Sequence, residues 1–367
     1  MNNIFGLNNN GNTCYQNAAL QALFCISKFT DYITNKKLLI KIIQNYKNET
    51  NSLNDIFLSL VFLLFLEEDD KIKNPSIISK CIKDYKIKYK DNITTPFKNE
   101  FPKYEQLDSY DYINAILTIL HKELKCNFIL NQDEIFKLKD DAENYYNDIN
   151  NNDIDYNKQN ILNYSSKQLK KIIYEGYSII NKIFSGQYIN ISECENCGFK
   201  NFSFTLSDTL DLDLFNNENH IIFNNLYDCL DNQMNINLYS DNNHHKQKTG
   251  HLRCYSYYKI FYPPSVLIIR LKRFNDKSKI NNPIDIPLSL NINKYIHMFS
   301  KKDNENYNYE LCSAVIHLGN LGGGHYISIG KKNNMWLEFN DSSVSIINNS
   351  NINNYLNKSY ILFYQRI

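Results

Sequence analysis

The stretch GLNNNGNTCYQNAALQALF, residues 6–24, carries the strongest chemical signal in the sequence. From Cys14 onward its apolar residues recur every three or four positions, which predicts a helix that begins at or just before Cys14. A helix N-terminus stabilises a thiolate through its free backbone N–H groups and its dipole. Gly11 permits a tight turn before the helix, and the polar residues upstream could supply an oxyanion hole. On its own, a cysteine at a helix start is more often a packed core thiol.

A second stretch, near the other end of the sequence, offers the base that a thiol nucleophile needs. GNLGGGHYISIG, residues 319–330, places His325 at the start of a predicted strand, and WLEFNDSSV, residues 336–344, predicts the next strand. A hairpin of these strands could bring Asn340 or Asp341 beside the imidazole as the acceptor that orients it. A lone histidine before a strand is more often structural. The combination of base, hairpin and polar acceptor is what favours catalysis.

A third motif has the spacing of half a tetrahedral zinc site. Cys194 and Cys197 form a CxxC that runs into Gly198. The sequence contains no second CxxC, but His251 and Cys254 form an HxxC that would complete a Cys3His site. His244 and His245 lie close by as substitutes. The alternative is that the cysteine pair remains from a lost site.

The order of the predicted elements indicates an α+β fold. Helical periodicity marks residues 14–26, 38–46, 56–66 and 107–124, whereas short alternating or apolar runs typical of strands dominate from Phe184 onward. Helices followed by strands are typical of α+β proteins and not of doubly wound folds. Residues 133–163 are rich in Asn and Asp and have little apolar periodicity, which predicts an exposed insertion.

The composition excludes several classes of protein. Lys plus Arg is 40 and Asp plus Glu is 39, so the net charge of +1 lacks the basic footprint of a general nucleic-acid binder. The longest nearly pure apolar run, residues 56–66, is too short to span a bilayer. The nine cysteines are odd in number, and polar residues follow Met1 in place of a signal peptide. We therefore expect no nucleic-acid partner, no membrane, and reduced thiols in the cytoplasm, the nucleus or both.

Together these segments resemble the ubiquitin-specific protease family of deubiquitinating cysteine proteases. Residues 6–24 match its Cys box, GLxNxGNTCYxNxxLQxL, and LCSAVIHLGNLGGGHY, residues 311–326, matches its His box. Three further segments occur in the family's order: EQLDSYDYINAILTILHKEL (105–124), PPSVLIIRLKRF (263–274) and YILFYQR (360–366). The matches span nearly the whole chain, so chance and biased composition explain them poorly.

The resemblance implies a role for each matching site residue. Cys14 would be the nucleophile, and His325 the general base and then the general acid. Asn340 occupies the third triad position, with the adjacent Asp341 as the runner-up. The side-chain donor of the oxyanion hole would be Asn9, with Asn12 as a weaker candidate.

The resemblance also implies a papain-like fold shaped as a hand. Residues 1–367 would form one catalytic domain, with a helical thumb at about 1–130, the insertion at about 133–163, and sheet-built fingers and palm at about 184–367. The tail of ubiquitin, ending in Leu-Arg-Gly-Gly, would run between thumb and palm. Four residues are expected to contact it, the two acids pairing with the tail arginines: Asp108, Asp111, Gly324 and Tyr326.

The implied function is a thiol-dependent deubiquitinase. It would hydrolyse the isopeptide or peptide bond after the C-terminal Gly of ubiquitin through an acyl-enzyme thioester, act on ubiquitinated proteins as a monomer, and need no cofactor for catalysis. A structural zinc in the fingers would use Cys194, Cys197, His251 and Cys254, since alignment to the family's second CxxC reaches His245 and the unsuitable Lys248. The alternatives are a protease for another ubiquitin-like modifier and a catalytically weak ubiquitin-binding scaffold.

Overall fold

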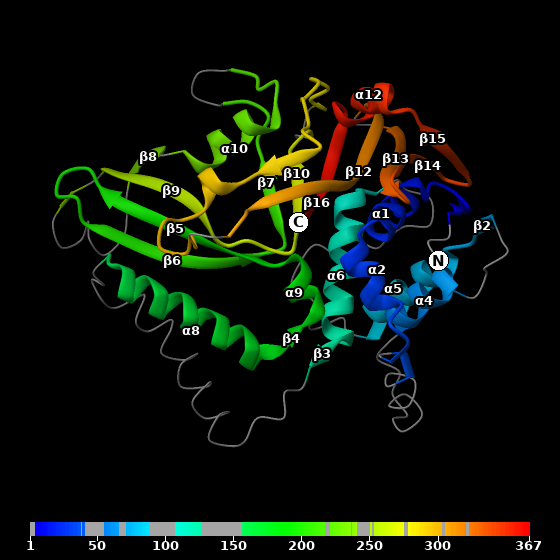
Figure 1. Ribbon diagram of the computed structural model, residues 1–367, viewed down its shortest axis with the longest axis horizontal. Helices are drawn as coiled ribbons and strands as arrows, with labels where there is room; N and C mark the ends of the chain where they lie inside the picture. The colour runs from blue at the N-terminus through cyan, green and yellow to red at the C-terminus, as the bar shows by residue number, and fades with distance from the viewer. Residues whose placement is uncertain are drawn as a thin grey trace.

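The helices of the N-terminal part gather at one end of the molecule and strands extend from there to the other end, as Figure 1 shows for this computed structural model. The structure describes residues 4–37, 39–40, 55–65, 71–88, 107–126, 156–216, 221–235, 237–240, 250–251, 253–274, 278–302, 305–320 and 323–367. We call the helical end the thumb, the long sheet beside it the palm, and the far sheet the fingers. No helix within these ranges is both long and apolar enough to cross a membrane.

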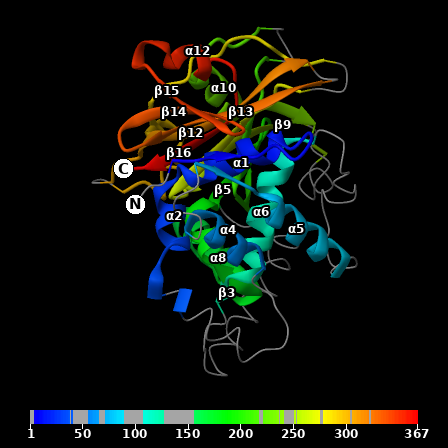
Figure 2. The same ribbon diagram turned by 90° about the vertical axis from the view of Figure 1, so that its right-hand side faces the viewer.

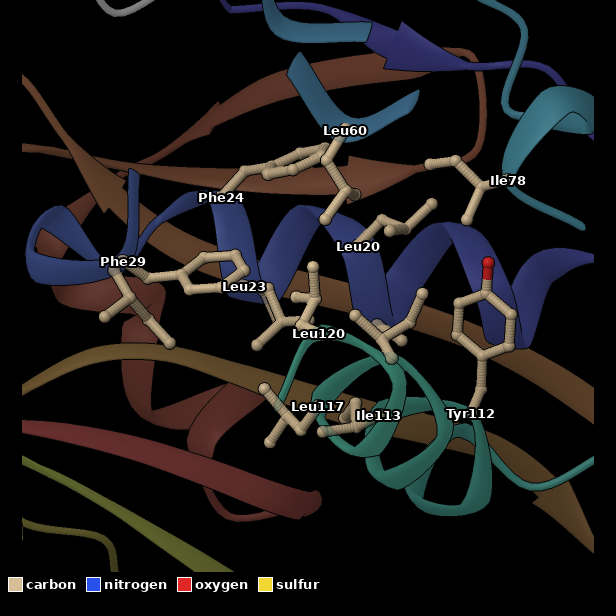
Figure 3. Packing of buried hydrophobic residues seen from close by; sticks show 14 of the residues in the cluster. Leu20, Leu23, Phe24, Phe29, Leu60, Ile78, Tyr112, Ile113, Leu117 and Leu120 are labelled. Atoms are coloured by element: carbon tan, nitrogen blue, oxygen red, sulfur yellow. The ribbon is translucent and has the colours of Figure 1, made fainter. Parts of the chain in front are cut away.

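The thumb is built around a fully buried first helix. All eleven residues of α1, Cys14–Phe24, are buried, and its alanines allow neighbouring elements to approach closely. Its Leu23 lies toward Leu117 and Leu120 of α6, and its Leu20 lies toward Leu60 and Ile78 on the other side (Figure 3). The other thumb elements are α2 (Ser27–Ile33), α4 (Asp55–Phe65), α5 (Ser76–Lys88), α6 (Ser109–Glu123) and the parallel pair β1 (Gly6–Leu7) and β2 (Ile72–Lys73).

The palm is an eight-stranded sheet that supports α1 on one face, as the second view shows (Figure 2). Its strand order is β15-β14-β13-β12-β16-β10-β7, with β11 beside β12. The pairing is antiparallel except between β10 and β7. The strands are β7 (Thr209–Leu212), β10 (Val266–Leu271), β11 (Ser289–Asn291), β12 (Asn308–Asn320), β13 (Gly323–Lys332), β14 (Met335–Asn340), β15 (Ser343–Ile347) and β16 (Ser359–Arg366).

The fingers are a four-stranded antiparallel sheet with the order β6-β5-β9-β8. Helix α8 lies along one side of it (Figure 1) and buries Ile161 against isoleucines of β5 and aromatic residues of β6 and β9. These and the remaining elements are β3 (Lys125–Cys126), α8 (Lys158–Gly176), β4 (Tyr177–Ser178), α9 (Ile179–Phe184), β5 (Gly186–Cys194), β6 (Lys200–Ser207), α10 (Leu226–Met234), β8 (Asn237–Ser240), β9 (Arg253–Tyr262), η1 (Asn293–Tyr295), η2 (Asn349–Asn351) and α12 (Ile352–Leu356).

The predicted helices at 14–26, 56–66 and 107–124 are confirmed as α1, α4 and α6. Most of the one predicted at 38–46 lies outside the described residues, as do 133–155 of the predicted insertion. The end of that insertion was wrong, because residues 158–163 form the start of α8. The Asn157 side chain caps this helix by accepting from the Asn160 N–H.

Candidate active site

The loop before α1 folds around one asparagine side chain. Asn9 Oδ1 accepts hydrogen bonds from the backbone N–H of Gly11 and from both the N–H and the hydroxyl of Thr13, each at 3.1 Å. Gly11 and Asn12 have φ values of 92° and 50°, a left-handed turn that glycine and asparagine tolerate best. The loop then enters the helix at Cys14, as predicted.

The Cys14 thiol is buried at this helix start. Burial raises the pKa of the thiol, the backbone of Tyr326 acts to lower it, and the negative charge of Asp341 raises it again. The net effect is a raised pKa, so the thiol of the resting protein is protonated at neutral pH. A base must therefore remove the proton before the sulfur can attack.

The β13–β14 hairpin brings a histidine and its acceptor together. Its two-residue turn, Asn333 and Asn334, has φ values of 51° and 62°, the conformation that suits tight hairpins. His325 Nε2 lies 2.7 Å from Asn340 Oδ1. The amide oxygen can only accept, so the proton sits on Nε2 and Nδ1 is the nitrogen available to the thiol.

The contacts of Asp341 differ from those of Asn340. Its carboxylate accepts from Asn9 Nδ2 at 2.9 Å and from Asn17 Nδ2 at 2.7 Å, and its backbone oxygen accepts from the Leu7 N–H at 2.8 Å. The residue therefore ties the loop before Cys14 to the end of the palm hairpin. Of the two neighbouring acceptors that the sequence left open, the structure brings Asn340 and not Asp341 into contact with His325.

Asn17 is a site residue that our sequence reasoning did not single out. It lies one turn after Cys14 on α1 and is 2% exposed. Besides Asp341, its amide is close enough to donate to the backbone oxygens of Leu7 and Asn8. Its position in the Cys-box pattern was the signal that could have identified it.

The sequence profile described as "Ubiquitin carboxyl-terminal hydrolase" matches residues 5–364. The chain belongs to this family. It is a cysteine-type deubiquitinating peptidase, and the expected α+β fold with its helical N-terminal and sheet-rich C-terminal parts is confirmed.

Relatives of this hydrolase cover nearly all of its length. One from Acanthamoeba polyphaga mimivirus, named a probable ubiquitin carboxyl-terminal hydrolase, is 27% identical over 99% of this chain and 90% of its own. Ubiquitin carboxyl-terminal hydrolase 4 of Arabidopsis thaliana is 25% identical over 99% of this chain and 93% of its own. Among solved structures, a chain of the SAGA DUB module Ubp8/Sgf11/Sus1/Sgf73 bound to monoubiquitin has a TM-score of 0.67 at 20% identity, covering 99% of this chain and 69% of that one.

The two acids expected to bind the ubiquitin tail differ in their surroundings. Asp108 caps α6: it accepts from the Tyr110 N–H at 2.8 Å and from the Tyr360 hydroxyl at 2.7 Å. Burial raises the pKa of both Asp108 and Asp111. Because both Asp108 oxygens are engaged inside the protein, Asp111 in the first turn of α6 is the better placed to meet a substrate.

The start of β13 is packed too tightly for any side chain at Gly324. A Cβ there would collide with the backbone oxygen of Leu318 and with the ring of His317. That ring lies 4.6 Å from the Tyr326 ring and 5.2 Å from the Phe274 ring, measured between centroids. Burial, together with the charges of neighbouring groups, lowers the pKa of His317 to about 4, so this histidine stays neutral beside His325.

Three of the four predicted metal ligands cluster in the fingers. The ligand atoms of Cys194, Cys197 and His251 all lie within 4.8 Å of one another, and Cys194 Sγ is 3.4 Å from His251 Nδ1. Such a set suits a thiolate- and imidazole-binding ion such as Zn²⁺. Cys254 pairs with Cys194 across β5 and β9 but is not part of this cluster. The substitutes, His244 and His245, lie outside the described residues.

Proposed function

We propose that this hydrolase cleaves the isopeptide or peptide bond after the C-terminal Gly of ubiquitin, with Cys14, His325 and Asn340 as its catalytic triad. The observation that carries the proposal is the 2.7 Å contact of His325 Nε2 with Asn340 Oδ1. It leaves Nδ1 as the base for a thiol at a helix N-terminus. The family match over residues 5–364 supports one catalytic domain for the whole chain.

The reaction would run in two halves. His325 takes the Cys14 proton as the sulfur attacks the carbonyl carbon, and then gives it to the leaving amine. The amine departs and leaves ubiquitin bound to Cys14 as a thioester. Water then gives a proton to His325 and attacks the thioester, and the proton returns to sulfur as the ubiquitin acid departs. The Asn9 amide, held by Asp341, and the backbone N–H groups of the helix start would stabilise the oxyanion, with Asn12 as a weaker candidate.

A ubiquitin carrying a C-terminal electrophile tests the triad directly. We expect covalent labelling of the wild-type protein and none of Cys14→Ala, with the modified residue mapped by peptide mass spectrometry. Cys312→Ala is a matched control, since it removes a different partly buried thiol and should be labelled normally. Labelling of Cys14→Ala would contradict the assignment of the nucleophile. Reaction only with probes of another ubiquitin-like modifier would contradict the substrate.

We also propose a structural zinc held by Cys194, Cys197 and His251, with Cys254, which pairs with Cys194 across β5 and β9, as the fourth ligand. Bound zinc would link the β5–β6 turn to the start of β9 and would take no part in the chemistry. Metal analysis of the purified protein should find about one zinc per chain. Cys197→Ser, at an exposed ligand, should lower that ratio and the thermal stability, whereas a ratio near zero in the wild type would contradict the site.

The remaining expectations concern assembly and location. We propose that the hydrolase acts as a monomer in the cytoplasm, the nucleus or both. The location is supported by the eight cysteines whose side chains are described, none of which forms a disulfide. Sedimentation equilibrium should give the 43.3 kDa mass of one chain. A concentration-dependent dimer would contradict the first part, and localisation of a tagged protein tests the second.

A further inference from the structure

Strand β10 presents one row of side chains to the thumb. Val266 and Ile268 belong to the hydrophobic core shared with α1 and α6, while Leu267 and Ile269 belong to the core on the other face of the palm. Because alternate residues of a strand share a face, Arg270 continues the thumb-facing row. Arg270 thus places a cation at the next position of the row, at the edge of the core.

The Arg270 guanidinium is held in a fixed position. Its Nε and Nη2 donate to the two carboxylate oxygens of Asp211 on β7, at 2.7 and 2.5 Å. Its central carbon lies 3.8 Å from the centre of the Tyr110 ring, in the first turn of α6. A bidentate pair and a stacked ring together restrict the group far more than either alone. The side chain is still 26% exposed, so solvent or a ligand can reach it.

This cation faces the acidic first turn of α6. Asp111 follows Tyr110 directly, and Asp108 precedes it as the helix cap. The Arg270 charge acts to lower the pKa of both carboxyls against the effect of their burial. The turn expected to attract a basic substrate tail thus already has a counter-ion, which also bonds to Asp211.

We propose that Arg270 determines how strongly this hydrolase selects a cationic substrate tail, by partly neutralising Asp111 before the substrate binds. An arginine of the tail that approaches Asp111 would feel the attraction of the carboxylate and the repulsion of Arg270 together. Loss of that tail arginine would then cost little. The inference rests on the proposed ubiquitin hydrolysis and adds a specificity-determining residue to it.

The test compares two substrates on each enzyme. One is ubiquitin with a C-terminal fluorogenic amide, and the other is the same conjugate with its tail arginines replaced by glutamine. The measured quantity is the ratio of their kcat/KM values. We expect a modest ratio for the wild type and a ratio about three- to tenfold larger for Arg270→Gln, a typical coupling between neighbouring charges. The increase should appear mainly as a lower KM for the arginine-bearing substrate, which no longer meets the repulsion of Arg270.

Lys272→Gln is the matched control. Lys272 lies two residues further on and pairs with Asp213 at 3.1 Å, so the exchange removes the same charge without touching α6. Its ratio should stay at the wild-type value, as should that of Arg270→Lys, which retains the cation. Asp211→Asn should move the ratio the other way, because Arg270 is then free to pair with Asp111. Asp211→Asn tests the role of Arg270 on its own if Arg270→Gln does not fold.

Equal ratios in the wild type and Arg270→Gln would overturn the inference, and so would an equal loss on both substrates, which indicates a merely structural role. Neither outcome touches the proposed function, which fails only if the wild-type enzyme cleaves neither substrate.

Discussion

Two neighbouring residues at the end of β14 divide the work of supporting catalysis. Asn340 contacts His325, whereas Asp341 holds Asn9 and Asn17 through its carboxylate. Asp341 achieves this with a left-handed φ of 51°, which turns its side chain away from that of its neighbour. The base and the oxyanion loop are therefore positioned by different side chains. Removing Asn340 and removing Asp341 should therefore have distinguishable effects on activity and stability.

The first prediction concerns Asn340. Removing the side chain in Asn340→Ala frees the His325 ring to rotate and to change tautomer, so kcat should fall about a hundredfold. Asn340→Asp restores an acceptor and should recover most of the activity. Steady-state kinetics with a ubiquitin amide measure both. If Asn340→Ala keeps nearly full activity while Asp341→Ala is inactive, Asp341 is the orienting residue and our choice is wrong.

The second prediction concerns Asp341. Asp341→Ala leaves the buried Asn17 amide without its charged acceptor, so the free energy of unfolding should drop by about 1–3 kcal/mol in addition to the loss of activity. Asn340→Ala should lose activity with a smaller change in stability, since its partner His325 is only partly buried whereas Asn17 is buried. Urea unfolding of the two variants gives the comparison, and equal losses of stability would contradict the division of roles.

The third prediction follows from the raised pKa of the Cys14 thiol. Only the thiolate reacts with an alkylating reagent, so a raised pKa keeps the resting enzyme slow at neutral pH. The rate of Cys14 alkylation by iodoacetamide should still be rising above pH 9, the ordinary value for a thiol. A plateau reached below pH 8 would show that the resting thiol is already ionised. Cys14→Ala supplies the background rate.

At the scale of elements, the start of β13 depends on one glycine. A Cβ at Gly324 would press on Leu318 and His317, whereas one at Gly323 would meet nothing within 4 Å. Gly324→Ala should therefore shift the start of β13, and His325 with it. We expect kcat/KM to fall at least about tenfold, with an unfolding free energy lower by about 1–3 kcal/mol. Gly323→Ala, next door, should behave as the wild type, and equal effects would contradict this account.

Much of this arrangement could be predicted from the sequence, and the exceptions have physical reasons. Apolar periodicity was sufficient for α1 and α6, because a buried helix face repeats every three or four residues. The start of α8 was missed because Asn and Lys around Ile161 resemble the insertion before it, and only the finger sheet gives that face something to cover. Composition cannot reveal such a partner.

The sequence alone also could not decide whether Asn340 or Asp341 orients His325. A change of one residue moves a side chain to the other face of a strand, so neighbours have unrelated surroundings. The left-handed backbone at Asp341 and the tether to Asn17 depend on contacts between residues more than 300 positions apart. The same holds for Arg270, whose partners come from α6 and β7.

For the whole molecule, two buried histidines predict sensitivity to acid. The pKa values of His297 and His317 are both lowered to about 4, chiefly by burial. An unfolded histidine binds its proton near pH 6.5, so stability is intact above that value and is lost as the pH falls toward 4. From pH 7 to pH 5 each should cost about 2 kcal/mol of unfolding free energy.

Urea unfolding at the two pH values measures this loss. His297→Gln cannot bind a proton and should show a smaller difference between pH 7 and pH 5 than the wild type. An unchanged difference would mean that other groups, such as the buried carboxyls, control the acid response.

Strand β16 occupies the middle of the palm, between β12 and β10, although it follows both in the chain. A ribosome must therefore finish residues 359–366 before the sheet can close, and until then β10 and β12 expose unpaired edges that invite aggregation. Cys14 emerges early, but its loop is tethered to Asp341. A nascent or prematurely terminated chain thus contains Cys14 without the His325 base and without the Asp341 tether. We therefore expect proteolytic activity to appear only after translation has passed β16.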